Sequence, residues 1–113
     1  MPFINVKTNV PIPAQREESL KADFGKAIST VPGKTESWLM VGFEPEYHLW
    51  FKGSNDPAAM VEISVFGSNP KDAYSKLTAA ICDSLSETLG LKKERIFVSY
   101  SETDKWGWNG NNF

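Results

Sequence analysis

Residues 20–31 read LKADFGKAISTV, and residues 77–88 read LTAAICDSLSET. In each segment, side chains that suit a buried helix face recur at spacings of three and four. The two sets keep a constant separation of 57 residues, as between Leu20 and Leu77. The matched faces predict two equivalent helices and an internal repeat. The first face is made of Leu20, Phe24, Ala27, Ile28 and Val31, and the second of Leu77, Ile81, Ser84, Leu85 and Thr88.

The segments that flank these helices repeat at the same separation. The corresponding apolar pairs are Ile4 with Val61, Val6 with Ile63, Leu39 with Ile96, and Val41 with Val98. Alternating apolar residues are typical of a strand with one face on a core. Each half is therefore predicted as strand, helix, strand, at 2–8, 14–31 and 38–44, then at 58–66, 70–89 and 95–101. A strand–helix–strand unit places its strands parallel, so we expect an α+β fold with a four-stranded sheet and both helices on one face.

Two glycines and two short segments complete the secondary-structure prediction. Gly33 and Gly90 follow the helices at the same 57-residue separation, where a left-handed helix cap is favoured. A further short strand is expected near His48–Phe51, since Leu49 and Phe51 alternate and Lys52-Gly53-Ser54 can turn the chain, and another near Lys105–Trp108.

Length and composition indicate one globular domain, 1–113, with a pseudo-repeat of about 2–44 and 58–101. The net charge is −2, with 12 basic and 14 acidic residues, which is not the basic excess of a nucleic-acid binder. Cys82 is the only cysteine and His48 the only histidine, so we expect no disulfide framework and no metal site. No apolar run is long enough for membrane insertion, and the N-terminus lacks a secretory signal. The expected location is cytoplasmic.

The predicted architecture leaves one sheet face without helices. Both alternating positions of the segments Trp38–Phe43 and Ile96–Tyr100 contain apolar residues. A large exposed apolar face on a small protein usually marks an association surface. We therefore expect an oligomer.

The N-terminus offers an unusual base. Pro2 follows Met1 and leads directly into a predicted strand. Removal of the initiator methionine would leave a secondary amine. Burial and a nearby lysine would lower the pKa of that amine, and a neutral amine is a competent general base. The alternative is that Met-Pro is an ordinary start without a catalytic role.

Several motifs, in order along the whole chain, resemble the macrophage migration inhibitory factor (MIF) and D-dopachrome tautomerase family. They are Pro2-Phe3-Ile4, Thr8-Asn9-Val10-Pro11, Gly33-Lys34, Gly53-Ser54-Asn55-Asp56-Pro57-Ala58, Tyr74-Ser75-Lys76-Leu77, Arg95-Ile96-Phe97 and Gly107-Trp108-Asn109-Gly110-Asn111-Asn112-Phe113. The resemblance implies the tautomerase fold, assembled as a homotrimer whose sheets form a central barrel and whose active sites lie between subunits. This assembly would cover the bare sheet faces.

The resemblance also implies a cofactor-independent keto–enol tautomerase of the phenylpyruvate type, acting on a small keto or enol substrate with a carboxylate. Pro2 would be the catalytic base, and Lys34 would bind the carboxylate together with the backbone N–H of Phe66. Lys34 has an alternative reading, in which it neutralises a helix C-terminus. The remaining substrate-binding positions implied by the resemblance are Val65, Trp38, Phe97, Ser99, Trp106 and Phe113.

The chain departs from the pattern of MIF itself at the implied pocket. Phe97 and Trp38 each stand where MIF has a tyrosine, Ser99 replaces an asparagine, Phe66 an isoleucine and Trp106 a valine. The pocket should be more aromatic and poorer in hydrogen-bond donors, which puts the substrate preference in doubt. The Cys-x-x-Cys motif is also missing, because residues 58–61 read AAMV, so no thiol oxidoreductase activity carries over.

Two other functions are compatible with the sequence. The resemblance implies signalling through a cell-surface receptor, by protein that leaves cells without a signal peptide, and the tautomerase site could then be vestigial. A ferredoxin-like module that binds a small molecule or RNA is a third reading. The lack of a basic excess and of an RNA-binding aromatic motif argues against RNA.

Overall fold

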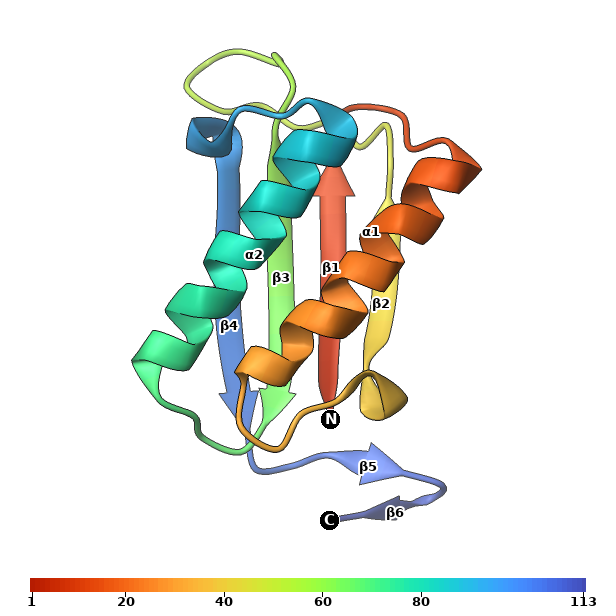
Figure 1. Ribbon diagram of the computed structural model, residues 1–113, viewed down its shortest axis with the longest axis vertical. Helices are drawn as coiled ribbons and strands as arrows, with labels where there is room; N and C mark the ends of the chain where they lie inside the picture. Colours follow the sequence, from red (N-terminus) through yellow and green to blue (C-terminus); the bar gives the residue numbers. More distant parts are fainter.

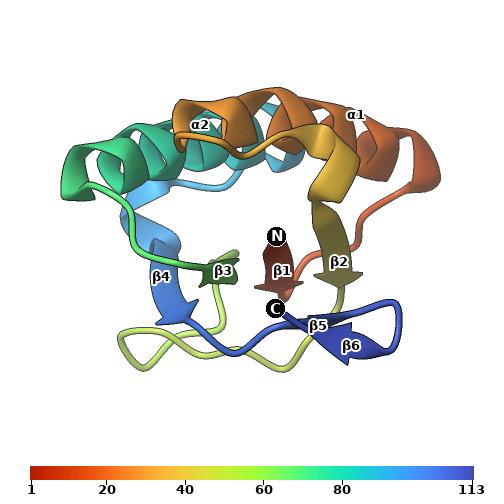
Figure 2. The same cartoon turned by 90° about the horizontal axis from the view of Figure 1, so that it is seen from below.

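The computed structural model describes residues 1–113 as a two-layer α+β domain, with both helices on one face of a four-stranded sheet (Figure 1, Figure 2). The sheet order is β2-β1-β3-β4. The main elements are β1 (Pro2–Thr8), α1 (Ala14–Ala27), β2 (Met40–Glu44), β3 (Ala59–Phe66), α2 (Lys71–Leu89) and β4 (Ile96–Thr103). The predicted order of elements, the sheet and the placement of the helices are confirmed.

The strand register reflects the internal repeat. β1 is parallel to β2, and β3 is parallel to β4. The two units meet through β1 and β3, which are antiparallel, with Ile4 opposite Ile63 and Val6 opposite Val61. Corresponding residues of the two repeats therefore lie close together at the middle of the sheet, and their side chains join one core.

The core lies between the sheet and the helices and is built from the residues that the helical spacing predicts. Leu20, Phe24, Leu77 and Ile81 are completely buried, together with the inward residues of β1 and β3. Burying a side chain of this size contributes about 1.5–3 kcal/mol relative to leaving it exposed. The packed helices and sheet thus provide a rigid support for the ends of the strands. Neither helix is long and apolar enough to cross a membrane.

Several predicted boundaries are wrong. α1 ends at Ala27, and a 3₁₀ turn, η1 (Ile28–Thr30), takes over the end of the predicted helix. Trp38 belongs to a second 3₁₀ turn, η2 (Glu36–Trp38), which is closed by the Leu39 N–H donating to the Glu36 carbonyl at 3.1 Å. The β2 strand consequently begins only at Met40.

Of the two additional short strands, the one predicted near Lys105–Trp108 is confirmed in part by β5 and the one near His48–Phe51 is wrong. The segment 48–51 is not a strand, and only Phe51 forms an isolated bridge, with Ser54 across a tight turn. The C-terminal tail forms a separate hairpin of β5 (Gly107–Trp108) and β6 (Asn111–Asn112). This hairpin lies beyond the end of the sheet where β1 starts, on the side away from the helices (Figure 1, Figure 2).

The sheet face without helices is less apolar than expected. By strand alternation it carries apolar side chains such as Met40 and Phe97, both exposed. Its middle is polar, however: Lys7 forms an ion pair with Glu62 at 2.8 Å. The expectation of a broad apolar face holds only near the strand ends.

Candidate active site

Pro2 lies at the start of β1, at the end of the sheet that the C-terminal hairpin overhangs (Figure 1). It is buried, and it pairs in register with Val65 of β3. Val65 is fully buried, and its side chain packs in the core between the sheet and the helices. The chain therefore places its N-terminal segment at a sheltered position between β2 and β3.

Lys34 reaches this position from the segment that joins η1 to η2. Gly33 has φ of 75°, a left-handed conformation that costs glycine little, so the chain can turn immediately before Lys34. The Lys34 Nζ then donates to the carbonyl oxygen of Phe66 at 2.9 Å. The Lys34 side chain is therefore held at the end of β3, and its role in binding a carboxylate stays a prediction beside the alternative of neutralising a helix C-terminus. Gly33 is a turn residue and not a helix cap, whereas Gly90 caps α2 with φ of 72°.

The backbone of Phe66 connects Lys34 with the N-terminus. Its N–H donates to the carbonyl oxygen of Met1 at 3.2 Å, while the Phe66 carbonyl accepts from Lys34. Burial, followed by the charge and hydrogen bonding of Lys34, lowers the pKa of the Met1 amine. This part of the sheet therefore favours a neutral amine beside a cation and a backbone donor. That combination suits proton transfer next to a bound anion.

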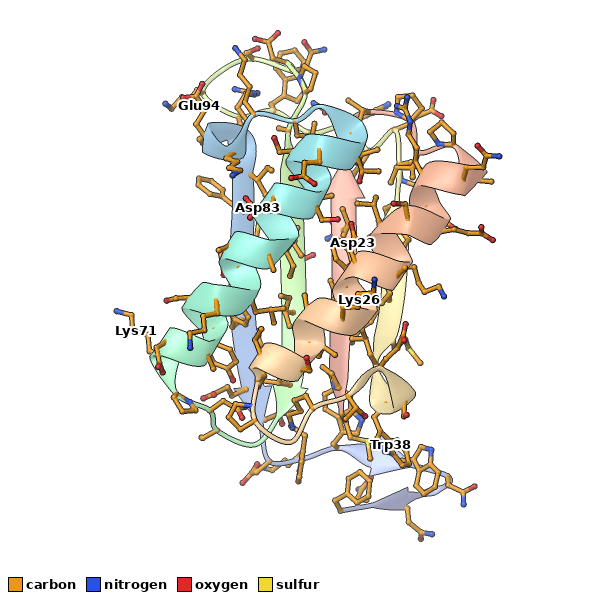
Figure 3. All side chains as sticks on the ribbon, in the orientation of Figure 1. Asp23, Lys26, Trp38, Lys71, Asp83 and Glu94 are labelled. Atoms are coloured by element: carbon orange, nitrogen blue, oxygen red, sulfur yellow. The ribbon has the colours of Figure 1, made fainter.

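Aromatic rings surround the same end of the molecule. The Trp38 ring meets the Trp108 ring edge to face, with centroids 5.1 Å apart, and the Phe66 and Phe113 rings lie 5.6 Å apart. Figure 3 shows Trp38 beside the C-terminal hairpin. The Phe113 N–H donates to the Trp106 carbonyl at 2.9 Å. Trp38, Trp106 and Phe113 are thus gathered here with Trp108, which the sequence prediction of the site omitted.

Phe97 and Ser99 are not close to Pro2 within one chain. Glu102 of β4 is level with Val65, which lies opposite Pro2. Phe97 lies five residues before Glu102 on β4, about 17 Å away along the strand. There the Phe97 ring packs against Phe51, with centroids 4.8 Å apart. A single chain therefore assembles the Pro2 end of the predicted site without these two residues.

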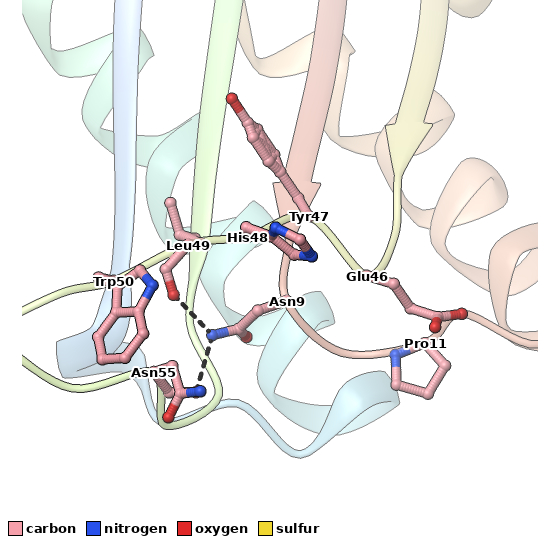
Figure 4. Close-up of a pocket in the computed structure, with 8 residues that line it drawn as sticks. All are labelled: Asn9, Pro11, Glu46, Tyr47, His48, Leu49, Trp50 and Asn55. Carbon is pink, nitrogen blue, oxygen red and sulfur yellow. Dashed lines mark hydrogen bonds between the residues drawn. The ribbon is translucent and has the colours of Figure 1, made fainter.

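A hollow of about 470 Å³ lies near the end of β1 remote from Pro2 (Figure 4). It is lined by Asn9, Pro11, Glu46, Tyr47, His48, Leu49, Trp50 and Asn55. The Asn9 amide donates to the carbonyls of Leu49 and Asn55, and so holds the loop in place. His48 is exposed here, and no hydrogen bond joins it to a nucleophile or carboxylate. The Pro2 end remains the better candidate for catalysis.

Comparisons with known proteins agree with one another along the whole chain. The sequence model of one protein family, described as macrophage migration inhibitory factor (MIF), matches residues 1–113. The mouse macrophage migration inhibitory factor is 30% identical over 118 residues, covering 100% of this chain and 99% of the relative. A homologue from Trichinella spiralis is 28% identical, with 100% of both chains covered.

Solved structures give the same picture. The crystal structure of MIF2 from Leishmania major superimposes with a TM-score of 0.94 at 32% identity, covering 100% of this chain and 97% of that one. The macrophage migration inhibitory factor of Toxoplasma gondii gives a TM-score of 0.91 at 25% identity, covering 98% and 99%. The similarity thus extends over the helices, the sheet and the C-terminal hairpin.

Proposed function

The chain belongs to the macrophage migration inhibitory factor family, and from this premise we propose that it is a cofactor-independent keto–enol tautomerase of 2-oxo acids such as phenylpyruvate. Its catalytic base is the secondary amine of Pro2, exposed by removal of Met1. The observation that carries the proposal is the position of Lys34, whose ammonium group lies beside both the Met1 amine and the Phe66 carbonyl.

Removal of Met1 would create the reactive site in two ways. The Pro2 nitrogen would change from an amide, which has no available lone pair, to an amine. The Phe66 N–H, which donates to the Met1 carbonyl at 3.2 Å, would lose that acceptor. A substrate oxygen can take the place of the Met1 carbonyl. Lys34 and the Phe66 N–H would then hold the carboxylate between them.

The proton transfer follows from this placement. The neutral Pro2 amine removes a proton from the carbon next to the keto group, so that a C–H bond breaks and an N–H bond forms. The electron pair moves onto the keto oxygen as the enolate develops. The protonated amine then returns the proton to that oxygen, which gives the enol and regenerates the base. Lys34 lowers the pKa of the Met1 amine, and the same positive charge would help to keep the Pro2 amine deprotonated after Met1 is removed.

The active protein is proposed to be a homotrimer. Phe97 is 56% exposed in the single chain, and it lies far from the Pro2 of its own chain. A neighbouring subunit packed against the open sheet face would bring its own Phe97 and Ser99 to this Pro2. The apolar residues near the strand ends would be covered in the same contact.

A second proposed role is signalling outside cells through a cell-surface receptor. It is favoured by the effect on macrophage migration that names the relatives, which match this chain over its full length. A cell-migration assay that compares purified protein with its Pro2→Gly variant tests this role separately from catalysis. An effect retained by the variant supports signalling without turnover, and no effect from either protein contradicts the role.

The catalytic proposal is tested by a phenylpyruvate tautomerase assay on protein whose N-terminus has been shown by mass spectrometry to be Pro2. We expect keto–enol conversion well above the buffer rate without any added cofactor. Matched protein that retains Met1 is the control, and it should be inactive. Conversion at the buffer rate by the processed protein would contradict the proposal.

A further inference from the structure

The chain that leaves Phe66 is held by a carboxylate on the neighbouring strand. The backbone N–H of Asn69 donates to Glu102 Oε2 at 3.0 Å. The Tyr74 hydroxyl donates to the same oxygen at 2.6 Å, and the Asn69 side-chain amide donates to the Tyr74 oxygen at 3.1 Å. Glu102 thus joins the loop after β3, the first turn of α2 and the end of β4.

This loop continues directly from Phe66, which is paired with Thr103 of β4. β3 ends at Phe66, and the next residue, Gly67, has φ of 88°, so the chain turns sharply. The Gly67 N–H donates to the Thr103 carbonyl at 2.9 Å. Glu102 holds Asn69 only two residues later. Both contacts tie the exit from Phe66 to β4, and Phe66 is the residue whose N–H and carbonyl meet the N-terminus and Lys34.

The packing of α2 on β4 has other supports. The Tyr100 hydroxyl lies 2.7 Å from Thr78 Oγ1 and donates to the Tyr74 carbonyl at 3.0 Å. The Tyr74 and Tyr100 rings stack with centroids 4.4 Å apart. The helix therefore stays docked without the Glu102 carboxylate, which is itself exposed. The part of the structure that depends on Glu102 is the loop after Phe66.

We propose that Glu102, together with Tyr74, is a positioning residue that keeps the Phe66 peptide aligned with Lys34 for binding of the substrate carboxylate. This inference rests on the function proposed above. The hydrogen bonds from Tyr74 and Asn69 lower the pKa of Glu102, so the carboxylate stays charged and a strong acceptor at neutral pH. Without it the loop after Phe66 keeps only the Gly67–Thr103 hydrogen bond to β4, and the Phe66 carbonyl holds the Lys34 ammonium less firmly.

The test compares phenylpyruvate with its methyl ester, which has no carboxylate charge. For Glu102→Ala we expect KM for the acid to rise about tenfold, the size typical of one lost charge-assisted hydrogen bond, with kcat changed much less. KM for the ester should stay within about twofold, because the ester makes little use of the Lys34–Phe66 pair. Glu102→Gln keeps a neutral acceptor and should lie between wild type and Glu102→Ala.

Glu94→Ala is the matched control, because Glu94 is exposed, lies on the turn before β4 and makes no hydrogen bond or ion pair (Figure 3). It should leave both substrates unaffected. An acid KM unchanged in Glu102→Ala, or an equal rise for acid and ester, would overturn the positioning role. A processed wild-type protein without turnover of either substrate would overturn the tautomerase function and this inference together. The two failures are therefore distinguishable.

Discussion

Lys34 Nζ lies 2.9 Å from the carbonyl oxygen of Phe66, although 32 residues of sequence separate the two. The contact joins the turn after α1 to the end of β3. It orients a cation toward the position where the substrate carboxylate is proposed to bind, and it uses a backbone acceptor that no side-chain substitution removes. The ammonium group still has two further N–H donors for a ligand.

Lys34→Ala should weaken binding of carboxylate substrates. We expect KM for phenylpyruvate to rise about tenfold or more, because one charge-assisted contact is lost. The measurement is steady-state kinetics with the acid and its methyl ester. Lys21→Ala, which removes an exposed lysine of α1, is the control and should behave like wild type. An unchanged KM in Lys34→Ala would show that Lys34 does not bind the carboxylate.

Lys34→Ala should also change the pH dependence. Burial and then Lys34 lower the pKa of the Met1 amine, and the charge of Lys34 should act on the Pro2 amine in the same way once Met1 is removed. Removal of this positive charge raises the amine pKa. The base works only when it is deprotonated, so kcat/KM rises with pH through that pKa. The midpoint of this rise should move to higher pH in the variant. A midpoint at the same pH in both proteins would indicate that the titrating base lies elsewhere.

Gly90→Ala should destabilise the fold. Gly90 caps α2 with φ of 72°, a conformation in which a Cβ atom costs about 1–2 kcal/mol. Urea unfolding should show a loss of about that size. Ser75→Ala, at an exposed position of the same helix, should change the unfolding free energy by no more than about 0.5 kcal/mol. Equal stability of Gly90→Ala and wild type would mean that the cap relaxes without strain.

The fold could be predicted from the sequence because the buried apolar residues recur at the regular spacings of helices and strands. Leu20 and Leu77 mark the same face of equivalent helices, and the strand pairs repeat at the same separation. The antiparallel meeting of β1 and β3 does not follow from such spacings, since alternation shows which face is buried and not which neighbour pairs. Periodicity also could not place Lys34. Its position came from the family resemblance, and the structure brings it to Phe66.

Contacts between segments far apart in the sequence were the least predictable part of the site. The Trp108 ring packs edge to face on the Trp38 ring. No periodic pattern in the sequence predicts that these two residues are in contact. Nothing in the sequence distinguishes Glu102 from other exposed carboxylates. Its role becomes visible only in the fold, where Tyr74 and Asn69 donate hydrogen bonds to it. Phe97 illustrates the opposite case. The resemblance assigned it to the site, but the strand register of one chain keeps it at a distance from Pro2.

The homotrimer should be visible in solution. Light scattering at micromolar concentration should give about three times the chain mass of 12.6 kDa. If Phe97 lines the site of a neighbouring subunit, Phe97→Tyr should change the ratio of kcat/KM for phenylpyruvate and its 4-hydroxy analogue, since a new hydroxyl alters polar recognition. Catalysis by Pro2 should persist. A stable, active monomer would contradict both the trimer and a site shared between subunits.

The N-terminal amine itself provides the most decisive prediction. Pro2→Gly keeps a free amine but makes it primary and loosens the start of β1, so turnover should fall strongly while the oligomer persists. Protein that retains Met1 should be at least as impaired, because the Pro2 nitrogen is then an amide. In addition, the Phe66 N–H donates to the Met1 carbonyl and is not free to bind substrate. Both proteins should unfold within a few degrees of wild type, as measured by circular dichroism. Mass spectrometry must accompany each assay. Full turnover by a sample in which every chain carries Met1 would exclude the Pro2 amine as the base.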